Sequence, residues 1–137
     1  MKSNRPEPSD EETRPLVLIV DDDAAVRESL AAVIEAFGFR TCTAGNGLEG
    51  LEAVALEAPS AIITDLQMPE MDGFELLSAL RRTETVIPVV AISGGIAKGY
   101  DFLGAAKRMG AVATFPKPLA VLEVIDTISG LTAQRAA

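Results

Sequence analysis

Residues 16–23 read Leu-Val-Leu-Ile-Val-Asp-Asp-Asp, which is five consecutive apolar residues followed by three carboxylates. A continuous apolar run of this length is typical of a strand buried on both faces of a parallel sheet. Residues 61–65, Ala-Ile-Ile-Thr-Asp, have the same design, with Asp65 at the end of the run. A carboxylate at the end of a buried strand adds little to packing, so both segments indicate a polar site where the strands end.

Apolar runs alternate along the chain with segments in which apolar residues recur at helical spacing. The alternation predicts five strands, each followed by a helix, at residues 16–20, 39–43, 61–64, 86–92 and 111–115. Right-handed crossovers between parallel strands place helices on both faces of such a sheet. The sequence therefore predicts a doubly wound α/β fold in the common order 2-1-3-4-5, where strand 5 is an edge strand that tolerates Pro116 at its end.

Apolar spacing also predicts which residues of the helices face the core. The second helix is expected to use Leu48 and Leu51, and the last helix Leu122, Ile125 and either Ile128 or Ser129. Asp23 and Asp72 precede helical segments and are expected to act as N-terminal caps.

Composition limits the class of protein. The 137 residues fit one domain, and 48% hydrophobic against 23% charged residues is typical of a soluble globular protein. The net charge of −8 and the scattered basic residues argue against nucleic-acid binding.

The single cysteine, Cys42, suits a reducing compartment and is expected to be a buried structural thiol. No export signal or membrane-length apolar run is present, so we expect a cytoplasmic protein without a membrane partner.

The chain is expected to divide into three parts. Residues 1–14 contain two prolines and no apolar residue after Met1, which predicts a flexible tail. Residues 15–130 form the predicted domain, and residues 131–137 a short C-terminal tail. With nothing folded expected after the domain, any output must pass through protein contacts, for which we expect the face formed by the fourth helix, the fifth strand and the last helix.

Polar side chains end the predicted strands at one edge of the sheet. Asp21 and Asp22 follow strand 1, Asp65 ends strand 3, Ser93 follows strand 4 and Lys117 follows strand 5. Because adjacent strands lie about 4.8 Å apart, these side chains are expected to converge. Carboxylates this close raise one another's pKa unless a cation lies among them. Oxygen ligands without a neighbouring His or Cys favour a hard ion, most simply Mg²⁺.

This set of side chains suits phosphoryl transfer. Asp65 would be the carboxylate nucleophile, with magnesium neutralising the phosphate charge. The hydroxyl of Ser93 and the compact cation of Lys117 would contact the phosphoryl oxygens.

Four short segments resemble, in order and over residues 16–130, the motifs of response regulator receiver domains. They are Leu-Ile-Val-Asp-Asp-Asp (18–23), Thr-Asp-Leu-Gln-Met-Pro-Glu-Met-Asp-Gly (64–73), Ala-Ile-Ser-Gly (91–94) and Phe-Pro-Lys-Pro (115–118). The resemblance implies a flavodoxin-like fold and a signalling protein that is not an enzyme in the ordinary sense, although it catalyses its own phosphorylation and hydrolysis.

The resemblance also assigns roles to single residues. It implies that Asp65 is phosphorylated from a histidine kinase or a histidine phosphotransfer protein, and that phosphorylation switches binding to a downstream protein target. It implies that Asp21, Asp22, Asp65 and the backbone carbonyl of Gln67 surround Mg²⁺, and that Ser93 and Lys117 bind the phosphoryl group. The Lys117-Pro118 peptide bond is expected to be cis.

The chain departs from the family pattern three residues before Lys117. The family favours an aromatic residue there, often Tyr, whereas this chain has Thr114. Phe115 is expected to point to the opposite face by strand alternation and so is not a simple substitute. The segment that follows Ser93 contains four glycines, Gly94, Gly95, Gly99 and Gly104. They suggest that phosphorylation instead biases the loop after Ser93 and the following helix.

Two other functions remain open on the sequence alone. Asp21 and Asp23 have the spacing of the nucleophile and the acid/base in haloacid-dehalogenase-type phosphatases, although Ala25 stands where that motif prefers Thr or Val. The third possibility is an interaction module that works without phosphorylation, which the intact acidic set disfavours.

Overall fold

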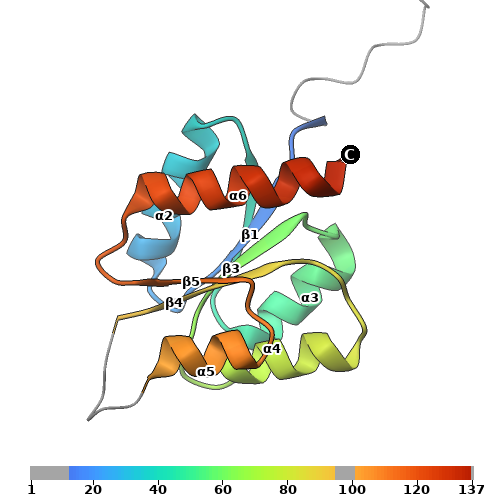
Figure 1. Ribbon diagram of the computed structural model, residues 1–137, viewed down its shortest axis with the longest axis vertical. Helices are drawn as coiled ribbons and strands as arrows, with labels where there is room; N and C mark the ends of the chain where they lie inside the picture. Colours follow the sequence, from blue (N-terminus) through green and yellow to red (C-terminus); the bar gives the residue numbers. More distant parts are fainter. Residues whose placement is uncertain (1–12, 95–100, 137) are drawn as a thin grey trace, which may run out of the picture.

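The sheet of the computed structural model, which describes residues 13–94 and 101–136, is parallel and has the strand order β2-β1-β3-β4-β5 (Figure 1). Its strands are β1 (Leu16–Val20), β2 (Arg40–Ala44), β3 (Ala61–Asp65), β4 (Val89–Ser93) and β5 (Ala113–Pro116). Its helices are α2 (Ala24–Ala36), α3 (Gly47–Glu57), α4 (Gly73–Arg82), α5 (Phe102–Arg108) and α6 (Val121–Ala136). The predicted doubly wound fold and its 2-1-3-4-5 order are confirmed.

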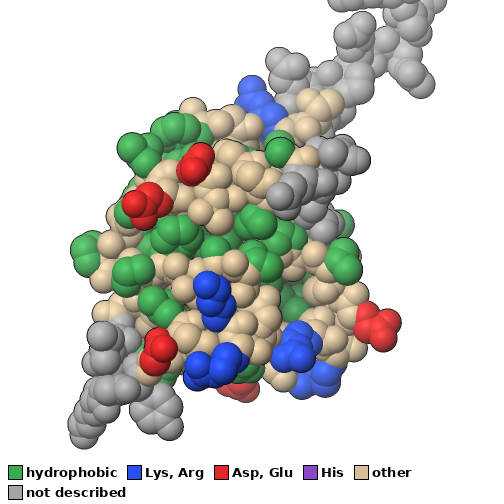
Figure 2. Space-filling model, viewed as in Figure 1, with side chains coloured by type: hydrophobic (Ala, Val, Ile, Leu, Met, Phe, Trp, Pro, Cys, Tyr) green, Lys and Arg blue, Asp and Glu red, His purple; other side chains and the backbone are tan. Residues whose placement is uncertain are grey.

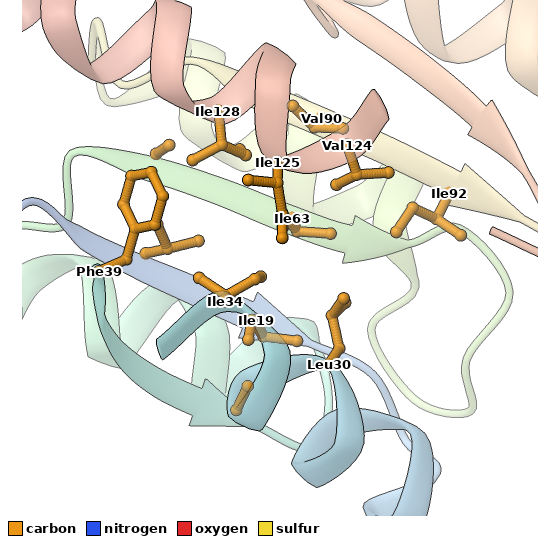
Figure 3. Packing of buried hydrophobic residues seen from close by; sticks show 13 residues of the cluster. Ile19, Leu30, Ile34, Phe39, Ile63, Val90, Ile92, Val124, Ile125 and Ile128 are labelled. Carbon is orange, nitrogen blue, oxygen red and sulfur yellow. The ribbon is translucent and has the colours of Figure 1, made fainter. Parts of the chain in front are cut away.

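Strand alternation divides the core into two layers, one on each face of the sheet. In β1, Ile19 packs toward α2 and α6, and its neighbour Leu18 packs toward α3, α4 and α5. Figure 3 shows the first layer, where Ile34 of α2 and Ile128 of α6 meet Ile63 of β3. Because β1, β3 and β4 are covered on both faces, every residue in these strands is buried.

Two aspartates begin helices, as predicted. Asp23 is the N-cap of α2, and its side chain accepts hydrogen bonds from the backbone N–H groups of Ala25 and Val26. Asp72 caps α4 in a reciprocal capping box with Glu75. These caps fix the direction in which the chain leaves β1 and the loop after β3.

Two strands begin two or more residues later than the sequence predicts. The strand predicted from residue 86 begins at Val89, because Pro88 has no N–H to donate to the ladder and Val86 is 80% exposed. The last strand begins at Ala113 instead of residue 111, because the N–H of Ala111 still closes the end of α5 by donating to Ala106 O.

The expected faces of two helices need correction. Leu122 is 70% exposed, and α6 packs through Val124, Ile125 and Ile128. Leu48 is 53% exposed at the start of α3. Both leucines lie in the first turn, where the direction in which the chain enters the helix decides which side faces the sheet.

Helix α6 continues to Ala136, past residue 130, after which the sequence predicts a C-terminal tail at residues 131–137. Leu131 packs against the first core layer, and the Thr132 side chain is buried with its hydroxyl donating to Ile128 O. The apolar spacing of the helix simply continues past residue 130. Residues 1–12 of the predicted N-terminal tail, together with Gly95 and Gly99, lie outside the described residues.

Cys42 is half-buried, less enclosed than predicted, because β2 is an edge strand. Its side chain packs against the second core layer. Burial raises the pKa of the Cys42 thiol, and the charge of Glu57 raises it further. The thiol is therefore a structural group with little thiolate character.

None of the helices in the described part of the chain is long and apolar enough to cross a membrane.

Candidate functional site

The carboxyl ends of the central strands bring three buried polar residues to one edge of the sheet. Asp21 directly follows β1, Asp65 ends β3 and Ser93 ends β4, and they are 6%, 7% and 4% exposed. The parallel register pairs Asp65 with Ile92, so that Ser93 lies one residue further along the neighbouring strand. This is the edge at which doubly wound folds bind their ligands.

An acidic cluster forms at this edge, as the sequence predicts. Carboxylate oxygens of Asp21, Asp22 and Asp65 all lie within 4.8 Å of one another. Burial raises the pKa of Asp21, an effect that a hydrogen bond from the Asp23 N–H partly offsets and that the charge of Asp65 adds to. The crowded negative charge and the all-oxygen donors fit Mg²⁺, which prefers carboxylate ligands and retains some of its waters.

Lys117 places its ammonium group on the acidic cluster. Its Nζ lies 3.0 Å from Asp65 Oδ2 and 3.4 Å from Asp21 Oδ2. Burial alone would lower the pKa of Lys117, but the hydrogen bond and charge of Asp65, together with Asp21, outweigh it and raise the pKa. The lysine is therefore fully charged at neutral pH, within reach of any group that joins Asp65.

The backbone around Lys117 fixes this position. The Lys117 N–H donates to Ser93 O at 2.9 Å, which joins the end of β5 to the end of β4. The Lys117-Pro118 peptide bond is cis, as expected.

Gln67 lies beside the Asp65 carboxylate in the loop between β3 and α4. Its backbone N–H donates to Asp65 Oδ1 at 3.1 Å. The same carboxylate therefore has one oxygen held by the loop and the other held by Lys117. This arrangement fixes the rotation of the carboxylate, so that a single orientation faces the acidic cluster.

Asp23 and Thr114 lie apart from this arrangement. Asp23 uses Oδ1 to cap α2 and is not among the residues of the acidic cluster. Thr114 pairs with Ala91 of β4, whose side chain belongs to the second core layer, on the side of α5. Phe115 packs against the first layer, so its predicted orientation toward the opposite face is confirmed.

Arg27 contacts the backbone beside the acidic cluster, and the sequence analysis did not predict this contact. Its guanidinium Nη1 donates to the backbone carbonyl of Asp21 at 2.7 Å. The signal was present in the spacing, because Arg27 lies one helical turn after the N-cap Asp23 and its side chain points back along the helix toward the strand end.

Asp21→Asn is expected to stabilise the protein when no divalent cation is present. The pKa of Asp21 is raised above its ordinary value of 3.8, so the native state holds the proton more tightly than the unfolded chain. Stability from this group is full below the ordinary pKa and is lost as the pH rises through the raised one. Urea unfolding in EDTA should give the variant the higher free energy of unfolding at neutral pH, with the difference closing toward acid pH.

The matched control is Asp22→Asn, which removes a charge from the same cluster at an exposed position. It should change the free energy of unfolding less than Asp21→Asn does. An Asp21→Asn protein that is less stable than wild type at neutral pH in EDTA would contradict this prediction.

Comparison with known proteins places the chain in a family. Residues 17–129 match the family model of the response regulator receiver domain. The response regulator MprA of Mycobacterium leprae (strain TN) is 36% identical over 115 residues, which is 84% of this chain and 50% of that protein. Sporulation initiation phosphotransferase F of Bacillus subtilis (strain 168) is 34% identical over 113 residues, covering 82% of this chain and 89% of the relative.

Solved structures agree with this match. The receiver domain of the Francisella response regulator 1452 superposes with a TM-score of 0.82 at 26% identity, covering 89% of this chain and 99% of that one. The Vibrio cholerae chemotaxis protein CheY4 gives a TM-score of 0.76 at 25% identity, covering 86% and 98%. The chain spans about half the length of the MprA and PrrA relatives it matches. On the family model, the fold and these relatives, the chain belongs to the response regulator receiver domain family.

Proposed function

We propose that Asp65 accepts a phosphoryl group from a phosphohistidine on a histidine kinase or a histidine phosphotransfer protein, in the presence of Mg²⁺. The observation that carries this proposal is the position of Asp65, with Lys117 Nζ 3.0 Å from Oδ2 and two further carboxylates within 4.8 Å. Sporulation initiation phosphotransferase F, a relative of similar length, has a name that denotes phosphoryl transfer.

In the proposed transfer, a carboxylate oxygen of Asp65 forms a bond to phosphorus while the bond between phosphorus and the histidine nitrogen breaks. The electron pair of that bond stays on the imidazole nitrogen, which takes up a proton from solvent. Mg²⁺ bound by Asp21, Asp22, Asp65 and the Gln67 carbonyl would neutralise charge on the phosphoryl oxygens. Lys117 then exchanges its contact with Asp65 Oδ2 for a phosphoryl oxygen.

Ser93 and Lys117 would stabilise the phosphorylated product and also assist its hydrolysis. The buried Ser93 lies at the end of β4, on the strand next to Asp65, and its hydroxyl would donate a hydrogen bond to a phosphoryl oxygen bound at Asp65. Hydrolysis follows when water attacks phosphorus and the Asp65 carboxylate leaves with its electron pair, releasing inorganic phosphate. Both steps need the same stabilisation of phosphoryl charge, so the same residues serve both.

An apolar groove beside Lys117 suits the donor protein. It has a volume of about 420 Å³ and runs between α2 and the segment that leads into α6. Its lining residues are Ala25, Val26, Ser29, Leu30, Val33, Lys117, Pro118, Leu119 and Val121. Because Lys117 belongs both to this groove and to the acidic site, an apolar helix of the donor seated here would hold its phosphohistidine close to Asp65.

The state of Asp65 is then passed to a downstream protein, and we expect both exchanges to take place in the cytoplasm. The face formed by α5, β5 and α6 is our candidate for this contact. Figure 2 shows apolar side chains between α6 and α5, with basic side chains around α5 and the neighbouring part of α4. Val112 and Leu122 are exposed apolar residues of this part of the chain, and Lys107 and Arg108 lie in the last turn of α5.

Substitution separates this function from the two alternatives. Wild type incubated with a small phosphodonor and Mg²⁺ should gain the mass of one phosphoryl group, and Asp65→Ala should gain none. Loss in Asp21→Ala alone would instead support the haloacid-dehalogenase-type phosphatase, which the capping role of Asp23 already disfavours. No phosphorylation of the wild type would favour the phosphorylation-independent interaction module.

A further inference from the structure

The loop between β3 and α4 is held at two separate places. At its base, the Gly73 N–H donates to Leu66 O at 3.2 Å, which closes the loop on itself. At its far side, the start of α3 contacts Glu70 and Met71. Between these two points lies Gln67, whose backbone N–H is bonded to Asp65.

Gly47 makes the closer of the two contacts from α3. Its N–H donates to Met71 O at 2.8 Å. A Cβ built on Gly47 would lie 2.6 Å from both Met71 Cγ and Met71 O, and Gly47 is buried. Only a residue without a side chain allows the backbones to approach this closely, so any larger residue at position 47 would push Met71 away.

Asn46 adds a directional polar contact. Its Oδ1 accepts from the Glu49 N–H at 2.9 Å as the N-cap of α3, which leaves Nδ2 to donate to Glu70 Oε2 at 3.2 Å. Glu70 has φ of +62°, in the left-handed region that is costly for a residue with a side chain. The loop therefore has a strained turn at the place where Asn46 and Gly47 contact it.

We propose that Asn46 and Gly47 are positioning residues for the metal site, which act by holding the loop at Glu70 and Met71 so that Gln67 stays against Asp65. The inference rests on the Mg²⁺ site of the proposed function. Neither residue belongs to the acidic cluster. Outer-shell groups of this kind commonly change metal affinity by roughly 10–100-fold when they are altered.

Gly47→Ala tests the steric contact, with Gly45→Ala as its matched control. A Cβ on Gly45, two residues before Gly47, would meet its nearest atoms at an ordinary 3.5 Å. Mg²⁺ binding is measured by calorimetry on the full chain, and urea unfolding in EDTA reports folding. We expect Gly47→Ala to weaken Mg²⁺ binding by roughly tenfold while Gly45→Ala binds as wild type does.

Asn46→Asp tests the polar contact without removing the helix cap, because Asp is as good an N-cap as Asn. The new carboxylate would face Glu70, so the contact should open and Mg²⁺ binding should weaken. A purely electrostatic effect has the opposite sign, since added negative charge favours a cation. Combining Asn46→Asp with Glu70→Gln restores the wild-type charge and reverses the hydrogen bond, and it should recover the affinity.

The outcomes separate this proposal from the proposed function. Equal Mg²⁺ affinity in wild type, Gly47→Ala and Asn46→Asp would overturn the positioning role, even if Asp65 is phosphorylated. Wild type that binds no Mg²⁺ would overturn it as well. Weakened binding in Gly47→Ala and Asn46→Asp, with recovery in the double variant, would support it even if no phosphoryl transfer to Asp65 is found.

Discussion

Lys117→Ala is expected to lower the rate of phosphoryl transfer to Asp65 by roughly 10²-fold or more, the effect typical of removing one preorganised charge from a reacting oxygen. Lys117 Nζ lies 3.0 Å from Asp65 Oδ2 and is held by the junction of β4 and β5. No other Lys or Arg of the described residues forms an ion pair with Asp65. The rate is measured as the growth of the phosphorylated mass with a small phosphodonor at saturating Mg²⁺.

Two controls separate this loss from a folding defect. Lys107→Ala removes an exposed lysine from the last turn of α5 and should leave the rate unchanged. Lys117→Arg keeps the charge but replaces a compact ammonium by a planar fork, so it should recover only part of the rate. A Lys117→Ala protein that is phosphorylated as fast as wild type would contradict the assigned role of Lys117.

Gly73→Ala is expected to lower the free energy of unfolding by about 3 kcal/mol, at the upper end of the range for overpacking. A Cβ on Gly73 would lie 2.4 Å from Asp65 O and 2.8 Å from Leu66 Cα. Both atoms belong to the backbone at the end of β3, which is fixed between β1 and β4. Rotation of a side chain therefore cannot relieve the clash with the new Cβ. Urea unfolding should show a clear fall in the midpoint of the Gly73→Ala protein.

Gly130→Ala is the matched control for this substitution. Gly130 lies inside α6, and a Cβ there would have nothing within 4 Å. Alanine is favoured over glycine in a helix by about 1 kcal/mol, so this variant should be as stable as wild type or more stable. An unchanged urea midpoint in Gly73→Ala would contradict the prediction, because it would mean that the backbone at the end of β3 moves to accommodate the added Cβ.

The sequence predicts the sheet and the acidic site well for one physical reason. Strands covered on both faces must be apolar throughout, so the residue that ends such a run, as Asp65 does, stands out as polar. Parallel strands then bring these ends to one edge, which is where Asp21, Asp65 and Lys117 meet. The place of each polar residue at the end of an apolar run therefore also indicates its place at this edge of the sheet.

Other features depend on contacts that no local pattern encodes. The exposure of Leu122 depends on the direction in which the chain enters α6, and the start of β4 on the missing N–H of Pro88. The approach of Gly47 to Met71 joins segments that are remote in sequence. A glycine at a helix start is otherwise an ordinary feature, so the spacing alone could not identify this contact.

The central claim is that Asp65 is the phosphoacceptor, and peptide mapping of the phosphorylated wild-type protein tests it most directly. After reaction with a small phosphodonor and Mg²⁺, the acyl phosphate is reduced chemically to a stable derivative and located by mass spectrometry. We predict a single modified residue, at Asp65, that is absent when EDTA replaces Mg²⁺. Modification at Asp21, or no modified carboxylate in protein that has bound Mg²⁺, would contradict the claim.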